Sequence, residues 1–422
     1  MDKPLPDFFN DRAVIDDPAD YFGRIRAICP VQREPYQGAY MVTGYDELTE
    51  LLNRKDEGIS SCLSVLGPIP PLPFEPHGDD IGAQLDEVRD RLPWSAHLVC
   101  FDGARHAEHR TLITSLLTYR RIRQNEQYLR SLADRLIDGF ASEGQCNVVV
   151  RYAHATTTFA ISDFMGIPES DRAVLLEAIG APPSQIEGDA QAKVGPDPLA
   201  ALKDLFDGYL RERLERPRDD LLTELVQSKF RNGEDVPFET LSNLARFLFG
   251  AGQDTTSHLI SMAVRILAED SDLQERLRVE PARIGDFIEE VLRFDPPVKA
   301  AYRLAVRDTE LAGIPLPAGS VMTACLSAAN RDPRRFENPD AFDIDRAGLR
   351  DHIAFSRGLH ACPGAPLGRM EAGIAIERLL ARTKRLELDE TRHGPPESRH
   401  FRFVPTYTFR SLVDLHIKFE MA

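Results

Sequence analysis

The chain has 422 residues, of which 42% are hydrophobic and 28% are charged, and its formal net charge at neutral pH is −16. This composition is typical of a globular protein with a large core. The acidic balance disfavours general nucleic-acid binding, which needs positive charge against phosphates. Residues 1–6 begin no apolar run of the length that a signal peptide or a membrane anchor requires, so we expect a cytoplasmic protein without a membrane anchor.

The spacing of the six cysteines excludes several kinds of site. No two of them form a Cys-x-x-Cys pair, which argues against a zinc ribbon, a thioredoxin-type site and covalent attachment of c-type haem. A disulfide framework is not expected in a cytoplasmic chain of this size. The cysteines are Cys29, Cys62, Cys100, Cys146, Cys325 and Cys362.

The N-terminal part predicts short elements followed by a long irregular segment. Asp17 is expected to cap a helix that has Pro18 at its first position and runs to about Cys29. A strand is expected over residues 39–43 and a helix over 45–54. Residues 60–99 contain many prolines, which preclude regular structure over much of this stretch. A loop of this length is usually functional or mobile.

The middle of the chain is predominantly helical in its pattern. His106 and Arg110 are four residues apart, so both side chains would lie on one face of a helix. Further helices are expected over residues 125–141, 148–164, 171–179 and 199–214, and a proline-containing segment separates the last two.

The longest helical pattern covers residues 238–268 and contains the stretch Gly-Ala-Gly-Gln-Asp-Thr-Thr at 250–256. Glycine in a helix interior costs about 1 kcal/mol relative to alanine, so two glycines beside Asp254 and Thr255 suggest a deliberate opening. The Thr255 hydroxyl can donate to the carbonyl one turn earlier and widen the helix. A dinucleotide-binding loop does not fit, because no strand precedes this stretch and Thr255 stands where glycine is needed; a plain buried helix with a capping threonine is the other alternative.

The stretch from Phe355 to Gly364 is the one around which we interpret the rest of the chain. Glycines flank Cys362 and let the backbone approach a flat cofactor closely. An apolar helix follows from Pro366, and its N-terminal end directs partial positive charge toward the sulfur. We therefore interpret Cys362 as a thiolate ligand of haem iron; a buried structural cysteine is the alternative.

These motifs resemble those of the cytochrome P-450 family, and the resemblance extends from about residue 10 to residue 418. The haem-binding pattern Phe-Gly-x-Gly-x-His-x-Cys-x-Gly is matched except at Ser356, where the family has glycine. Residues 251–256 match Ala-Gly-x-Asp-Thr-Thr without departure. Glu290 and Arg293 match the family's Glu-x-x-Arg ion pair, and Arg346 matches its third member, so we assign these three residues a structural role.

The resemblance implies a mainly α fold with small β-sheets, triangular in outline, with a long central helix over the haem. The chain would form a single domain over residues 1–422. Its β-containing lobe would comprise about residues 30–60 and 305–325 together with the C-terminal strands, and the remainder would be helical.

The resemblance also implies a monooxygenase with non-covalent haem b and an axial cysteine thiolate. Asp254 would relay protons from solvent and Thr255 would orient dioxygen. The cofactor would be bound by His106, Arg110, Arg303, Phe355, His360 and Cys362. The pocket would take a small, mainly apolar substrate, and the residues expected along it are Trp94, His97, Leu98, Phe247, Gly250, Ala251, Val298, Ala301 and Phe409. For Trp94, simple anchoring of the loop is an equal alternative.

We expect no appended flavin or iron–sulfur domain, so the resemblance implies a separate ferredoxin with its reductase, acting on a monomeric enzyme. Docking is expected on the face nearest Cys362, where several arginines offer positive charge to an acidic protein. Two other functions stay open: a peroxide-driven peroxygenase, and a haem-based binding or sensor protein that does not catalyse. The docking arginines are Arg110, Arg120, Arg121, Arg123 and Arg357.

Pro363 directly follows Cys362 in this loop. Proline has no N–H, so one backbone donor that could reach the sulfur of Cys362 is absent. Fewer hydrogen bonds leave a thiolate more electron-donating. We therefore hypothesise a lower ferric/ferrous potential than leucine at this position would give; the alternative is that proline only shapes the loop.

Overall fold

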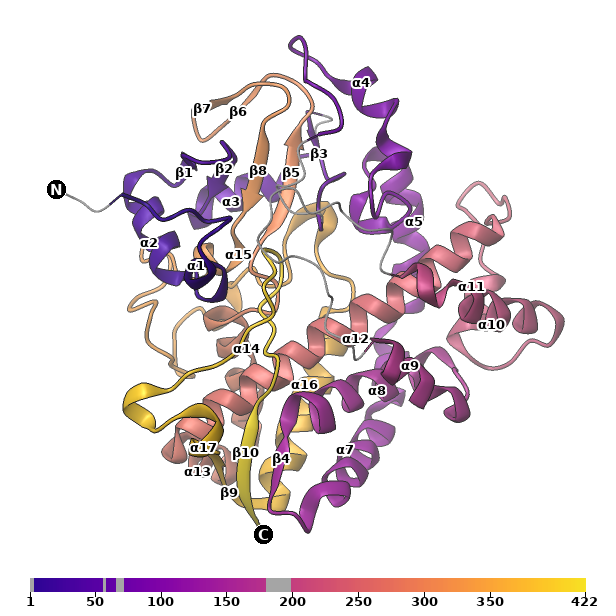
Figure 1. Ribbon diagram of the computed structural model, residues 1–422. Coiled ribbons are helices and arrows are strands. Elements are labelled where there is room, and N and C mark those ends of the chain that lie inside the picture. Colours follow the sequence, from indigo (N-terminus) through magenta and orange to yellow (C-terminus); the bar gives the residue numbers. More distant parts are fainter. Residues whose placement is uncertain (1–3, 56–57, 66–71, 180–198) are drawn as a thin grey trace.

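The computed structural model describes residues 4–55, 58–65, 72–179 and 199–422, and helices dominate it (Figure 1). The first group of helices is α1 (Arg12–Asp16), α2 (Ala19–Ile28), α3 (Tyr45–Asn53), α4 (Gly82–Asp86), α5 (Gly103–Leu116), α6 (Tyr119–Gln124), α7 (Glu126–Ala141), α8 (Ala155–Met165), α9 (Arg172–Ile179) and α10 (Lys203–Glu215). The second group is α11 (Leu221–Val226), α12 (Phe238–Glu269), α13 (Ser271–Val279), α14 (Ile284–Phe294), α15 (Leu326–Ala329), α16 (Ala365–Arg382) and α17 (Glu390–His393).

Three small sheets accompany the helices. The largest has the order β1-β2-β8-β5-β3, with β2 and β8 parallel and the other pairs antiparallel. Its strands are β1 (Val31–Arg33), β2 (Tyr40–Val42), β3 (Ile59–Ser60), β5 (Ala301–Ala305) and β8 (Val321–Ala324). The others are β4 (Gln145–Asn147), β10 (His416–Met421) and β9 (Thr383–Leu388) in one sheet and the hairpin β6 (Thr309–Leu311) and β7 (Ile314–Leu316). The predicted mainly helical class with small sheets is confirmed.

Helix α12 crosses the centre of the molecule (Figure 1). It packs against α8, α10, α14 and α16, and most of its side chains are buried. A helix that is apolar on nearly every side is stable only when other elements surround it. The predicted hydrogen bond within the helix forms: Thr255 Oγ1 donates to the carbonyl oxygen of Ala251 at 2.8 Å.

Most predicted elements occur close to their expected bounds, and two details differ. Pro18, not Asp17, occupies the cap position of α2; the Asp17 carboxylate instead accepts weakly from the Ala19 amide at 3.3 Å. The irregular segment predicted over 60–99 contains α4 and two short 3₁₀ turns, because these lie beyond its proline cluster. The proline-containing segment around 182–198 lies outside the described residues. No helix in the described part of the chain is long and apolar enough to cross a bilayer.

The predicted ion pair at the end of α14 forms in a fully buried position. Arg293 binds both carboxylate oxygens of Glu290, at 2.7 and 2.8 Å, and neither side chain is exposed. Arg346 Nε lies 3.2 Å from Glu290 Oε1. Arg293 also donates to the carbonyl oxygens of Asn330, Pro339 and Ala341. Since removal of one partner from a buried pair costs about 3–5 kcal/mol, this cluster fixes the irregular segment 330–346 against α14.

Candidate active site

The loop that carries Cys362 is folded tightly against α3. The Cys362 amide donates to the carbonyl oxygen of Phe355 at 2.8 Å, which closes the loop. Gly358 has a φ of +67°, and a Cβ there would lie 2.1 Å from the carbonyl oxygen of Leu52, so only glycine fits. Ser356 also has a positive φ, of +60°. The position where this sequence departs from the family pattern therefore has a conformation that favours glycine.

Two observations on Cys362 together indicate that its thiol faces the interior. Cys362 is exposed to a water-sized probe, yet burial raises the pKa of its thiol and the Gly364 amide only partly offsets this. Both observations hold together when the sulfur lies deep in the protein beside unfilled space. The amides of Gly364 and Ala365, at the N-terminal end of α16, are directed at the sulfur. Such donors, with the positive end of an 18-residue helix, stabilise a thiolate.

Four basic side chains gather beside this loop, and they come from three separate parts of the chain. The rings of His106 and His360 lie 4.1 Å apart, centroid to centroid. Arg110, one turn after His106 on α5, donates to the carbonyl oxygen of Ala361. Arg303 on β5 donates to Ser64 Oγ at 3.2 Å. The structure therefore brings together the four residues predicted to bind acidic groups of the cofactor.

Among the residues that the structure describes, no carboxylate forms an ion pair with this basic cluster, although Asp102 acts on His106 and Arg303 from a greater distance. Burial lowers the pKa of Arg110 and Arg303. Burial, followed by repulsion from the neighbouring cationic groups, lowers the pKa of His106 and lowers the pKa of His360 to about 2. His106 Nε2 is buried without a hydrogen-bond partner in the described part of the chain. Two guanidinium groups and two imidazoles without a neutralising carboxylate form a site for anions. They fit the two propionates of a haem.

The carboxylate nearest to this cluster is already engaged. Asp102 accepts from the Ser61 amide at 2.7 Å and from Arg89 Nη1 at 2.9 Å. Ser61 also approaches His360, with 3.0 Å between Oγ and Nε2. Sequence reasoning missed Ser61 and Ser64, because each belongs to an irregular segment and meets its partner only through tertiary packing.

The middle of α12 opens toward the interior at the predicted oxygen-handling residues. Ala251 is exposed, and Asp254 and Thr255 are half-buried, although the helix runs through the centre of the fold. Burial opposes ionisation of Asp254, but the neighbouring His258 outweighs it, and the pKa of Asp254 is lowered. His258 Nε2 lies 3.1 Å from Asp254 Oδ1. Asp254 is thus an ionised carboxylate held by a buried imidazole.

His258 is a site residue that sequence reasoning missed, although a signal existed. It follows Asp254 by four residues, so helical periodicity alone places the two side chains together. Its Nδ1 is buried without a partner among the described residues. Next to it, Gln253 Nε2 lies 3.0 Å from His154 Nδ1, and His154 also acts on the pKa of Asp254.

The residues predicted to line the substrate pocket fall into two groups. In the first, Val298 pairs with Phe409 in an isolated β-bridge, and the Phe409 ring lies 6.2 Å from that of His258. In the second, the rings of Trp94 and His97 are 5.2 Å apart, and His97 stacks on Phe247 at 5.5 Å. The first group therefore lies beside His258 of α12, and the second group contacts Phe247 in the N-terminal half of the same helix.

The other predicted pocket residues differ in their exposure. Ala301 is half-buried at the start of β5. Leu98 is buried in a core cluster with Phe101. At Gly250 a Cβ would lie 2.8 Å from Leu199 Cδ2, so the small residue is needed for packing of α12 against the segment before α10.

The arginines predicted to form a docking face differ in whether other side chains already engage them. Arg121 pairs with Glu224, Arg123 lies 3.1 Å from Glu126, and Arg357 donates to the Tyr45 hydroxyl. Arg120 is exposed. Beside it on α6, Tyr119 is 73% exposed, and Leu359 of the Cys362 loop is 47% exposed, so part of this face is apolar.

Comparisons with known proteins show which family this chain resembles. The family described as Cytochrome P450 matches residues 199–406. Cytochrome P450 144 of Mycobacterium tuberculosis is 34% identical over 395 residues, which cover 91% of this chain and 87% of that protein. Cytochrome P450 monooxygenase PikC of Streptomyces venezuelae is 34% identical over 298 residues, 68% of this chain and 69% of that protein.

A solved structure is similar over almost its whole length. Mycobacterium marinum cytochrome P450 CYP150A6, in the substrate-free form, superposes with a TM-score of 0.92 at 40% identity and covers 99% of both chains. The chain therefore belongs to the cytochrome P450 family, whose members are monooxygenases that bind haem b non-covalently through an axial cysteine thiolate.

Proposed function

We propose that this enzyme inserts one oxygen atom of O₂ into a small, mainly apolar organic substrate, with electrons from a separate ferredoxin and its reductase, and that Cys362 is its iron ligand. The observation that carries the assignment of the site is the cluster of four basic side chains beside an inward-facing thiol. We further expect a monomeric, cytoplasmic enzyme, as the sequence predicted.

Each residue of the loop has a distinct task in this proposal. Cys362 binds iron through its thiolate, and the amides of Gly364 and Ala365 stabilise the negative sulfur. The guanidinium carbon of Arg369 lies 4.5 Å from the centre of the Phe355 ring, so these two side chains together cover the loop. His106, Arg110, Arg303 and His360 bind the propionates, whose charge relieves the repulsion among them.

When bound, the haem supplies dioxygen activation and oxygen-atom transfer. Thr255 presents a hydroxyl to the interior and can orient dioxygen there. Asp254 accepts protons from solvent-connected groups and passes them on, which is the task of a general acid acting through water. Because His258 lowers its pKa, Asp254 is ionised at neutral pH and would readily release any proton that it receives.

The residues that support an apolar substrate are Phe247, Val298 and Phe409. They are half-buried, and their side chains are purely hydrocarbon. Phe247 lies on α12, and Phe409 lies beside His258 of that helix. Pockets for small molecules are lined mostly by such side chains, with few polar groups. A mainly apolar substrate is the class that this lining favours.

The iron ligand is tested by the Soret absorption of the reduced protein under carbon monoxide. Wild type is expected to give the band of thiolate ligation. Cys362→Ser should lose it, whereas Cys29→Ser, at another cysteine far along the chain, should keep it. A band of histidine ligation in wild type would refute the assignment of Cys362.

The reaction is tested by three parallel incubations of the holoenzyme with a panel of apolar compounds. Ferredoxin, its reductase and NAD(P)H should support oxygen insertion. Product formed with peroxide alone and not with the electron donors would favour the peroxygenase. Ligand-dependent spectral shifts without product under either condition would favour a binding or sensor protein.

A further inference from the structure

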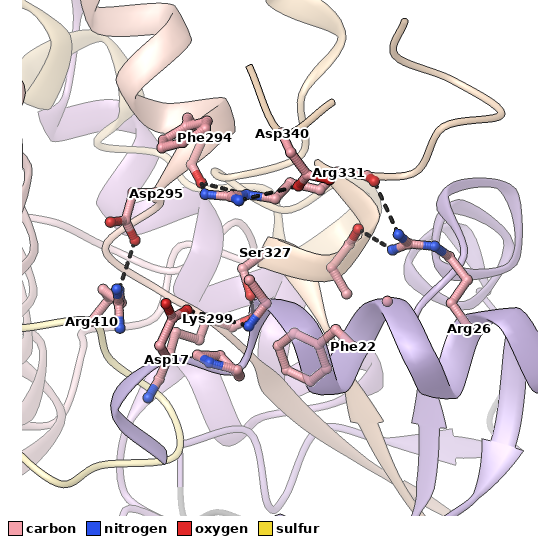
Figure 2. A pocket seen from close by; sticks show the side chains of 14 residues that line it. Asp17, Phe22, Arg26, Phe294, Asp295, Lys299, Ser327, Arg331, Asp340 and Arg410 are labelled. Atoms are coloured by element: carbon pink, nitrogen blue, oxygen red, sulfur yellow. Dashed lines mark hydrogen bonds and ion pairs between the residues drawn. The ribbon is translucent and has the colours of Figure 1, made fainter. Parts of the chain in front are cut away.

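A second pocket lies away from Cys362, between α2, the C-terminal end of α14 and the two segments 297–300 and 408–410 (Figure 2). Its volume is about 70 Å³. Because roughly 10–15 Å³ of such volume accepts one water molecule, it has room for a group of about five non-hydrogen atoms. Its walls include Pro18, Phe22, Lys299, Ser327, Arg331 and Arg410.

The backbone explains why two cations reach this pocket. The Lys299 amide donates to the carbonyl oxygen of Thr408 at 2.7 Å, and the Arg410 amide donates to that of Pro297 at 2.8 Å. Side chains alternate between the two faces of paired extended segments. Val298 and Phe409 therefore face one side, and Lys299 and Arg410 face the other, where the pocket lies.

The floor of the pocket carries more positive than negative charge. Lys299 is 4% exposed and Arg410 is 8% exposed. Arg410 Nε binds Asp295 Oδ1 at 2.8 Å, and Arg265 lies 3.3 Å from the other oxygen of Asp295. Lys299 Nζ donates to the carbonyl oxygen of Ile15 at 2.7 Å. The buried charged groups that line the pocket are therefore Lys299, Arg410 and Asp295. Asp295 is shared between Arg410 and Arg265, which is not part of the lining.

Two donors at this floor are incompletely used. Arg410 Nη1 is buried and has no hydrogen-bond partner in the described part of the chain. Lys299 Nζ has three protons, and Ile15 takes one of them. A buried donor without a partner costs about 1–3 kcal/mol, and an incoming acceptor would recover this cost.

The groups at the mouth of the pocket are already engaged with one another. Arg331 lies 3.3 Å from Asp340, which is 80% exposed. Arg26 donates to the carbonyl oxygens of Ala328 and Arg331, at 2.8 and 3.1 Å (Figure 2). Asp17 is exposed and accepts from the first amide of α2. At the mouth, Asp17 and Asp340 are exposed to solvent, whereas Lys299 and Arg410 are buried beneath them.

We propose that this pocket is a binding site for a small oxyanion, a carboxylate or a phosphate, held by Arg410 Nη1 and Lys299 Nζ. The size of the pocket, the unpartnered guanidinium nitrogen and the surplus of buried cations all point to this ligand chemistry. Burial, with Arg410 as the next contributor, lowers the pKa of Lys299 to about 7, while Asp16, Asp295 and Asp17 act in the opposite direction. A bound anion would favour the protonated amine.

Thermal unfolding of the holoenzyme tests the proposal, with inorganic phosphate and acetate as probes against chloride at equal ionic strength. Phosphate or acetate should raise the unfolding temperature of wild type by mass action. Lys299→Met should lose this gain, and Lys384→Met, an exposed cation on β9, should keep it. An equal gain in all three proteins would overturn the site. The tighter of the two probes identifies the ligand as a phosphate or a carboxylate.

A second measurement needs no variant. Acylation of the Lys299 amine in wild type, followed by mass spectrometry of its peptide, should slow about tenfold when the better probe is present at ten times its dissociation constant. Acylation of Lys384 in the same sample should not change. Unchanged acylation of Lys299 at saturating anion would overturn the proposal, whether or not the variants fold.

Discussion

At the scale of single residues, the Cys362 loop shows where the sequence departs from its family and what that departure costs. Ser356 occupies the left-handed region with a φ of +60°, where a residue with a Cβ is about 1–2 kcal/mol less stable than in the right-handed region. The loop accepts this strain because Gly358, two residues on, makes the closer approach to α3.

Ser356→Gly should therefore stabilise the folded protein. Relief of the strain exceeds the greater flexibility that glycine gives the unfolded chain, which costs about 0.5–1 kcal/mol, so we expect a net gain of roughly 0.5 kcal/mol. Thermal unfolding of the holoenzyme measures it. Gly358→Ala is the contrast and should lower haem retention, since its methyl group would overlap the backbone of Leu52; equal behaviour of the two variants would contradict this account.

Pro363→Leu should raise the ferric/ferrous potential. The sulfur already receives the amides of Gly364 and Ala365, and a residue other than proline adds an N–H one position earlier. Each added donor lowers the electron density on the thiolate. Spectroelectrochemical titration measures the potential, and Pro363→Ala should give the same direction of change, because the effect depends on the backbone. An unchanged potential in both variants would leave proline with only a role in loop shape.

His258 should control the protonation of Asp254. In wild type the pKa of Asp254 is lowered, so its ionised form contributes stability that is present above the ordinary carboxyl pKa and is lost as pH falls. In His258→Leu, burial, which raises the pKa, is opposed only by the more weakly acting His154, so the pKa should rise. Infrared titration should then show a protonated carboxyl band at higher pH than in wild type. His258→Gln, which keeps a hydrogen-bond donor, should shift it less, and Asp254→Asn should remove the band.

At the scale of elements, α16 carries a buried acid that its partners do not neutralise. Glu371 is 2% exposed, and its Oε1 has no hydrogen-bond partner among the residues that the structure describes. Burial raises the pKa of Glu371 to about 8. The acid is therefore protonated in the folded protein at neutral pH, while the unfolded chain has released that proton.

Stability should accordingly fall as pH rises between the unfolded pKa of 4.5 and the folded value of about 8. Glu371→Gln removes this dependence and should raise the free energy of unfolding at pH 8 by a few kcal/mol, with little effect at pH 5. Denaturant unfolding at the two pH values measures the difference. Glu377→Gln, on the same helix but with its side chain 34% exposed, is the control; parallel pH profiles for the two variants would refute the assignment.

Elements also differ in how far the sequence predicts them. The opening in α12 and the pair of Glu290 with Arg293 were predictable, because spacings of three and four residues place side chains together on any helix. Ser61 beside His360 was not, since 299 residues separate them and only tertiary packing joins them. The pocket behind Val298 and Phe409 was equally hidden, because it depends on the pairing of two irregular segments.

At the scale of the whole molecule, a net charge of −16 would repel the proposed acidic ferredoxin, so association requires a local surface of positive charge. The face beside the Cys362 loop offers such a surface, but several of its arginines are already engaged in ion pairs and hydrogen bonds. Arg121 is tied to Glu224 and Arg123 to Glu126. Arg120 is an exposed cation there, next to the exposed ring of Tyr119.

Arg120→Glu should therefore slow reduction of the haem by ferredoxin, with the larger effect at low salt, because rim charges act mainly on the association rate and are screened by ions. Stopped-flow reduction kinetics at two ionic strengths measure this. Lys384→Glu, an equal charge change on β9, should slow reduction only slightly, because it alters the net charge and not the docking face. Substitution of Arg121 is less informative, since it also breaks the contact with Glu224. Equal slowing by the Arg120 and Lys384 variants would show that ferredoxin senses the total charge of the enzyme and does not dock at this face.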